Sequence, residues 1–138
     1  MIVTVPAPVF PPVRKKTTGK LTPVNVWLNA NGRAHRQAEV PIIRAWREAG
    51  RAASAGGPRF EERVRIVAYV FKPRRGRYDP GNLYAVAKAA VDGLVDSGIL
   101  EDDDWVHLDG PDMRHGGIGP ARLVLTIEPA ENRIETAA

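Results

Sequence analysis

The stretch that decides the fold reads FEERVRIVAYVF and spans residues 60–71. Its apolar residues recur at every second position, which is the period of a strand with one buried face. Residues 79–97 follow as a predicted helix, because Asp79-Pro80 is a preferred helix start and Gly98 a preferred stop. These two elements predict a sheet with a helix packed on it.

The rest of the chain adds one further helix and several short strands. Residues 37–53 are expected to be helical, with Val40, Ile43 and Trp46 near one face. Strands are expected at residues 2–6, 24–28, 105–108 and 122–128. A basic, proline-rich loop is expected at residues 8–22 and a loop rich in Gly and Pro at 109–119. The order β-β-α-β-α-β-β predicts an α+β domain with a mixed sheet and two main helices. We expect one domain over residues 1–129 and a disordered tail over 130–138.

Composition excludes several classes of protein. The chain has 138 residues and no cysteine, so zinc ribbons, thiol catalysis and a disulfide framework are ruled out. No apolar run approaches the roughly 20 residues that span a bilayer. The first residues lack the basic cluster of a signal peptide. We therefore expect a soluble intracellular protein without a membrane partner.

Charge is distributed unevenly along the chain. Residues 1–78 carry a net charge of +12 and residues 79–138 carry −8, although the chain as a whole is only +4. All eight aspartates lie between Asp79 and Asp112. This pattern suggests either a polyanion partner with a carboxylate site for a hard cation, or a basic surface with acidic turns.

The chemistry-bearing residues lie between Lys72 and His107. A basic loop leads to Asp79, and the acidic run Glu101-Asp102-Asp103-Asp104 follows the predicted helix. If that run returns near the loop, the two sets of carboxylates would share Mg²⁺, which prefers oxygen ligands. Each residue also has a simpler interpretation. Asp79 would be a helix cap, the acidic run a solvated turn, Lys88–Asp92 a surface ion pair, and His107 and His115 surface residues.

Four motifs resemble the RusA family of Holliday junction resolvases, especially its phage-borne members. They are Arg74-Arg75-Gly76-Arg77-Tyr78, Asp79-Pro80-Gly81-Asn82-Leu83, Lys88-Ala89-Ala90-Val91-Asp92-Gly93-Leu94 and Asp102-Asp103-Asp104-Trp105-Val106. The closing stretch at residues 122–127 is also similar, and Leu28-Asn29-Ala30-Asn31-Gly32-Arg33 more loosely so. The specific part of the likeness runs from Arg74 to Val106.

The resemblance implies a RusA-like, dimeric fold and a crossover junction endodeoxyribonuclease of DNA recombination and repair. Such an enzyme would hydrolyse phosphodiesters by paired symmetric nicks in four-way junctions. It would need Mg²⁺, with Mn²⁺ as a possible substitute, and no small-molecule cofactor. It would act in the cytoplasm of a bacterium or of a phage's host cell. The alternatives are a non-catalytic protein that binds branched DNA, and a flap or fork nuclease.

The resolvase hypothesis that follows from the resemblance assigns residues. Asp79, Lys88 and Asp103 would be catalytic, and the metal ligands would come from Asp79, Asp92, Asp102, Asp103 and Asp104. Phosphates would be bound by Lys72, Arg74, Arg75 and Arg77, with the surface extended by Arg33, Arg36, Arg44 and Arg47. Tyr78 would stack at the junction or pack within its own loop.

Two departures from the family pattern concern the site. Gly81 stands where the family has a second aspartate, so Asp92, Asp104 or Asn82 would have to compensate. Three residues, 85–87, are inserted before Lys88, which keeps its face of the helix but moves it about 4.5 Å along the axis.

Overall fold

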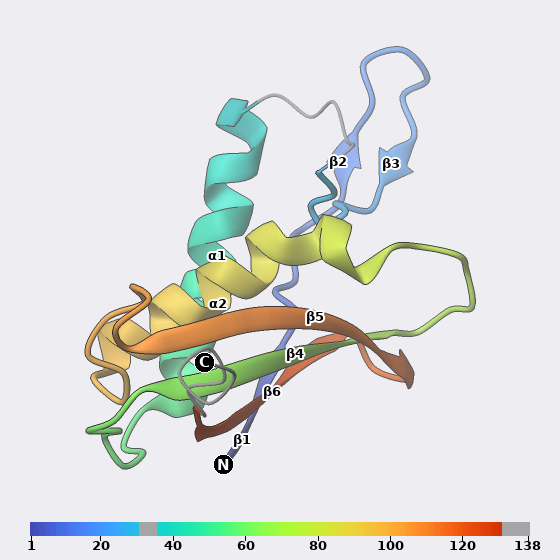
Figure 1. Ribbon diagram of the computed structural model, residues 1–138. Coiled ribbons are helices and arrows are strands. Elements are labelled where there is room, and N and C mark those ends of the chain that lie inside the picture. Colours follow the sequence, from blue (N-terminus) through green and yellow to red (C-terminus); the bar gives the residue numbers. More distant parts are fainter. Residues whose placement is uncertain (31–35, 131–138) are drawn as a thin grey trace.

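The chain folds as a mixed four-stranded sheet with two helices packed together (Figure 1). The computed structural model describes residues 1–30 and 36–130, with the side chain of Arg36 left out. The elements in chain order are β1 (Ile2–Pro6), β2 (Val13–Arg14), β3 (Leu21–Thr22), α1 (Arg36–Ser54), β4 (Val64–Lys72), η1 (Pro80–Leu83), α2 (Tyr84–Ser97), β5 (Leu108–Ile118) and β6 (Arg122–Pro129). The predicted α+β class with a mixed sheet is confirmed. Within the described residues no helix is both long and apolar enough to cross a bilayer.

Strand β4 is central to the sheet. The sheet order is β1-β6-β4-β5, and β4 pairs antiparallel with β6 and parallel with β5. Val64, Ile66, Ala68 and Val70 on one face of β4 are at most 1% exposed, which confirms the predicted alternation. The same core contains Trp46 of α1 and Leu94 of α2. Burial of this apolar face is what joins the sheet to the helices.

The predictions for residues 105–119, a short strand followed by a loop, are wrong. Residues 105–107 form a turn, and the stretch expected to be a loop is an eleven-residue strand. Because β5 lies at the sheet edge, it tolerates Pro111, which has no N–H to donate. The register with β4 shifts between Arg65 and Val67, beside Gly110, whose φ is +111°. A strand that carries such a bulge resembles a loop in sequence.

Two predictions for the N-terminal half are also wrong. The expected loop at residues 8–22 contains a hairpin in which Val13 pairs with Thr22 and Arg14 with Leu21. The stretch 24–28 is not a strand. It is held by packing instead, because Trp27 lies against the Trp46 ring at 5.0 Å and Val26 O accepts from Trp46 Nε1 at 2.9 Å.

The remaining elements match their predictions with small changes. Strand β1, helix α1 and strand β6 are confirmed, although Val40 is 40% exposed and Ile42 is buried in its place. Strand β4 begins at Val64, four residues later than expected. Of the expected tail only Ala130 is described, and its N–H bonds to Arg63 O. Residues 131–138 lie outside the described residues, as do Asn31, Gly32 and Arg33 of the stretch 28–33 that is loosely similar to the family.

The helix predicted from Asp79 to Ser97 divides into two segments. Pro80–Leu83 is a 3₁₀ turn, and the α-helix runs from Tyr84 to Ser97. Asp79 is the N-cap, since its side chain accepts from Gly81 N at 2.9 Å. Gly98 ends α2 with φ +88°, as expected of a glycine stop.

Helices α1 and α2 cross at two glycines. A β-carbon at Gly93 would overlap the Arg47 carbonyl oxygen and the Arg51 nitrogen, and one at Gly50 would overlap the Ala90 carbonyl oxygen. Both positions therefore allow a backbone approach that no side chain permits. This contact sets how close α2 lies to α1.

We expect Gly93→Ala to lower the free energy of unfolding by about 1–3 kcal/mol, because its methyl group must push the helices apart. The gain in helix propensity, about 1 kcal/mol, opposes this loss without cancelling it. Urea denaturation measures the change. Gly76→Ala is the control, because its β-carbon would meet no atom within 4 Å. Equal stability of Gly93→Ala and wild type would contradict the close crossing.

Candidate active site

A lysine between two aspartates forms the main polar cluster. Lys88 Nζ lies 2.8 Å from Asp92 Oδ1 and also forms an ion pair with Asp103 Oδ2. Lys88 and Asp92 are one turn apart on α2, and Asp103 comes from the turn before β5. Their side chains are 34%, 31% and 27% exposed, so the cluster is open to a substrate. One ammonium and two carboxylates give it a net charge of −1.

Asp79 lies elsewhere. It shares a cavity of about 540 Å³ with residues 76–78 and His115. No hydrogen bond or ion pair among the described residues joins it to Lys88 or Asp103. At 2.0 Å per residue in η1 and 1.5 Å in α2, the helical path from Asp79 to Lys88 is about 15 Å long.

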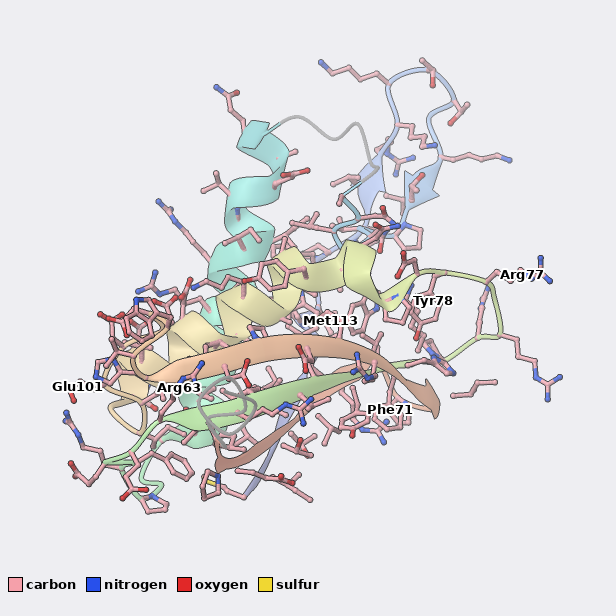
Figure 2. All side chains as sticks on the ribbon, in the orientation of Figure 1. Arg63, Phe71, Arg77, Tyr78, Glu101 and Met113 are labelled. Atoms are coloured by element: carbon pink, nitrogen blue, oxygen red, sulfur yellow. The ribbon has the colours of Figure 1, made fainter. Side chains whose placement is uncertain are left out.

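The acidic turn (residues 101–104) and the basic loop (residues 72–78) lie at opposite ends of β4, although the sequence allowed an arrangement in which they meet. Leu108 pairs with Val64 at the start of β4, whereas the basic loop leaves from Lys72 at its end. Figure 2 shows Glu101 and Arg77 at opposite ends of the sheet along the strand direction. The parallel pairing causes this separation, because the crossover returns the chain to the start of β4.

The other two candidate ligands are held within the acidic turn. Asp102 Oδ1 accepts from Asp103 N at 2.7 Å, and Asp104 Oδ1 lies 2.6 Å from His107 Nδ1. In the described part of the chain, no three His, Asp or Glu side chains gather so as to hold an ion. Asp92 and Asp103 remain as a pair of carboxylates. A pair suits Mg²⁺, which often takes one or two carboxylates and completes its shell with water and substrate phosphate.

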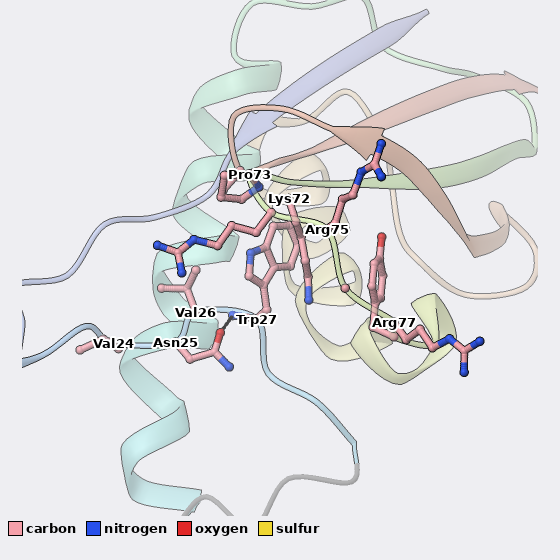
Figure 3. Close-up of a pocket in the computed structure, with 12 residues that line it drawn as sticks. Val24, Asn25, Val26, Trp27, Lys72, Pro73, Arg75 and Arg77 are labelled. Carbon is pink, nitrogen blue, oxygen red and sulfur yellow. Dashed lines mark hydrogen bonds between the residues drawn. The ribbon is translucent and has the colours of Figure 1, made fainter.

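The basic loop, residues 72–78, lines a second cavity of about 420 Å³ together with residues 24–27 and Ala121 (Figure 3). Arg74, Arg75 and Arg77 are exposed, and Arg77 points away from the cavity in Figure 3. Lys72 Nζ lies 4.3 Å from the Tyr78 ring centroid and 5.7 Å from that of Trp27, and burial lowers the pKa of Lys72.

The Tyr78 side chain contacts His115 and Lys72. Its hydroxyl hydrogen-bonds His115 Nδ1, its ring packs edge-on against the His115 ring, and Lys72 covers one ring face. Burial raises the pKa of Tyr78, so the phenol stays protonated and can donate to His115. This supports loop packing over stacking at a junction. No local pattern indicates the pairing, since His115 is 37 residues away along the chain.

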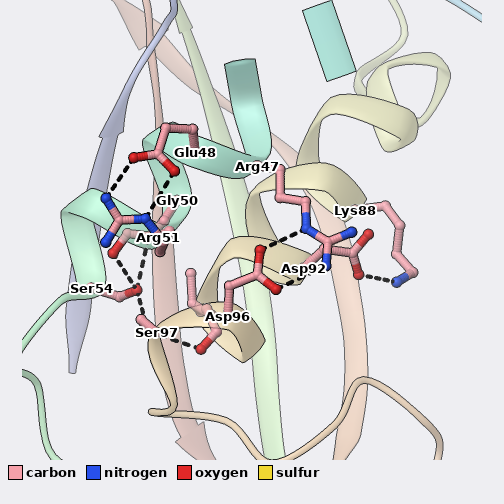
Figure 4. A network of polar contacts seen from close by, with 10 residues as sticks. Arg47, Glu48, Gly50, Arg51, Ser54, Lys88, Asp92, Asp96 and Ser97 are labelled. Atoms are coloured by element: carbon pink, nitrogen blue, oxygen red, sulfur yellow. Dashed lines mark hydrogen bonds and ion pairs between the residues drawn. The ribbon is translucent and has the colours of Figure 1, made fainter. Parts of the chain in front are cut away.

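Of the outer arginines proposed to bind phosphate, Arg47 is already paired. It forms two hydrogen bonds with Asp96, at 2.6 and 2.8 Å, and this carboxylate raises the pKa of Arg47 (Figure 4). Arg44 is exposed on α1. Arg33 and the side chain of Arg36 lie outside the described residues.

Compared with known proteins, the sequence matches no protein-family model and no curated protein. The likeness to RusA resolvases therefore rests on the motifs between Arg74 and Val106.

We expect the pKa of His107 to fall in Asp104→Asn. The hydrogen bond with Asp104 is the largest cause that raises this pKa above 6.5, against an opposing effect of burial. NMR titration of the His107 ring measures it, with Asp109→Asn as the control. A raised pKa means that the pair stabilises the fold below pH 6.5 and loses this effect as pH rises through the His107 pKa. An unchanged pKa in Asp104→Asn would contradict the pairing.

Proposed function

We propose that this protein is a magnesium-dependent endonuclease of the RusA type, which resolves four-way DNA junctions by paired symmetric nicks. The observation that carries the proposal is the ion pair between Lys88 and Asp103. These residues lie 15 positions apart, on a helix and in the following turn, and they are two of the three that the family motifs assign to catalysis. Their contact supports a shared role.

The cluster offers groups suited to phosphodiester chemistry. Lys88 supplies an ammonium that can stabilise negative charge developing on a phosphate oxygen. Asp92 holds that ammonium in place from one turn away, at 2.8 Å. Asp92 and Asp103 are the residues that would hold Mg²⁺. When bound, the ion would lower the pKa of a water molecule and neutralise charge on the phosphate.

The basic loop would bind the DNA backbone. Arg74, Arg75 and Arg77 are exposed and form no ion pair within the described residues. Phosphate contacts fix the position of DNA without reading its sequence, which suits an enzyme that recognises a branch. A two-fold homodimer would match the symmetry of the paired nicks.

A second candidate, a branched-DNA-binding protein without catalysis, is favoured by the surroundings of Gly81. A β-carbon at this position would lie 3.2 Å from Asp79 Oδ1, so the family's second aspartate would stand directly beside Asp79. Here that carboxylate is absent, and Asp79 instead accepts from Gly81 N. The arrangement is consistent with a site that binds DNA after losing its activity.

We expect wild type to nick a synthetic four-way junction only with Mg²⁺, and chelation of the metal to stop the reaction. Asp103→Asn and Lys88→Gln should each slow nicking at least ~100-fold, because each removes a charge that the transition state needs. Single-turnover gel assays measure the rate. Asp109→Asn is the control, because this aspartate lies on β5 outside the cluster.

The same assay separates the alternatives. Equally tight junction binding without nicks, by wild type and by Asp103→Asn, would contradict the enzyme and support the binding protein. Gly81→Asp then tests whether restoring one carboxylate restores metal-dependent nicking. Faster cleavage of flaps or forks than of junctions would identify the protein as a flap or fork nuclease.

A further inference from the structure

The hairpin β2–β3 is a basic arm that the nuclease site does not use. It projects from the molecule beyond the sheet, near the top of Figure 1. Every residue from 11 to 21 is exposed. The turn is built by backbone pairing, with Lys15 N donating to Lys20 O at 2.9 Å and Gly19 N to Lys15 O at 2.8 Å. Gly19 has φ +67°, a conformation that favours glycine, so the sequence specifies this turn.

The arm carries four cations and no acid. They are Arg14, Lys15, Lys16 and Lys20, and the chain has no acidic residue before Glu39. None of the four forms an ion pair within the described residues. Of their side chains, only that of Arg14 has a hydrogen-bond partner there, the backbone Gly19 O, to which it donates at 2.6 Å. Four like charges held on one short ribbon repel one another, and an anionic partner relieves that repulsion.

The arm is continuous with the basic loop. Residues 24–27 follow β3 directly and line one side of the 420 Å³ cavity, and residues 72–78 line the other (Figure 3). Lys72 Nζ lies over Trp27 and so joins the two segments. Together residues 13–22 and 72–78 hold eight basic residues and no acid. The surface therefore presents one sign of charge over both segments.

We propose that the hairpin β2–β3 and the basic loop together bind the backbone of one duplex arm of DNA. The inference rests on the proposed function for its partner and adds the surface that holds it. A two-stranded ribbon fits the major groove, where lysines and arginines reach the phosphates on either side. An anionic membrane is the less favoured partner, because residues 13–22 contain no aromatic anchor and the loop carries arginines, whose planar forks suit phosphate.

The salt dependence of DNA binding tests the proposal. Fluorescence anisotropy with a labelled linear duplex gives the binding constant of the full-length protein over a range of KCl concentrations. For Lys15→Gln/Lys16→Gln, the slope of log K against log[KCl] should fall in magnitude by about 1.8, because each phosphate that a lysine neutralises contributes about 0.9. These exposed positions contribute nothing to the core, so circular dichroism should match wild type.

The matched control, Arg59→Gln/Arg114→Gln, removes two exposed cations that lie outside both segments. Its slope should equal that of wild type. An unchanged slope in the hairpin variant, or an equal fall in both variants, would overturn the proposal. The proposal would also be overturned, in favour of a membrane, by a different result. In that result wild type floats with phosphatidylserine vesicles and Lys15→Gln/Lys16→Gln does not, while both bind DNA with the same slope of log K against log[KCl].

The nicking assay keeps this inference apart from the proposed function. If wild type nicks junctions but the hairpin variant has the same salt slope as wild type, the protein is a nuclease whose hairpin does not bind DNA. A protein that never nicks but whose slope falls in the hairpin variant still binds duplex DNA through it, and only the catalytic proposal fails.

Discussion

The parallel pairing of β4 with β5 constrains everything else in the molecule. Parallel neighbours cannot be joined by a tight turn, so η1 and α2 must cross the sheet between them. That crossover places the basic loop at one end of β4 and the acidic turn at the other. Since a nine-residue strand is about 30 Å long, carboxylates fixed at its two ends do not share an ion. The candidate chemistry therefore depends on α2, which carries Lys88 and Asp92 to meet Asp103.

The position of α2 depends in turn on its crossing with α1. Gly50 and Gly93 let the two backbones approach more closely than any side chain would permit. Arg47–Asp96 and Ser54–Ser97 join the same helices, but the first pair is 51% and 34% exposed. Exposed ion pairs contribute about 0–1 kcal/mol, so the glycine contact sets the geometry and the polar pairs add to it. A shift of α2 would move Lys88 relative to Asp103, which belongs to a separate turn.

Local sequence patterns predicted the elements that bury one face. Strand β4, helix α1 and the Asp79 cap follow from alternation, helical period and cap chemistry, and all three are present. Strand β5 could not be predicted in this way, because its Gly110-Pro111 bulge and edge position give it the composition of a loop. Contacts between residues far apart in the sequence could not be predicted from local patterns either. The Tyr78–His115 bond spans 37 residues, and the link from Asp103 to Lys88 was available only through the family resemblance.

The charge asymmetry of the sequence takes a specific form in three dimensions. Arg47, Arg59 and Arg65 each pair with an acid of the second half of the chain, at Asp96, Glu101 and Asp112. The cations of the hairpin and the basic loop have no such partner among the described residues, so the excess positive charge gathers there. The Lys88 cluster, at −1, would instead repel a phosphate. If DNA binds the basic side, as we propose, a cation held at this cluster would offset its carboxylates and reduce their repulsion of the phosphate. The net charge of the cluster is therefore one reason for including Mg²⁺ in the proposed function.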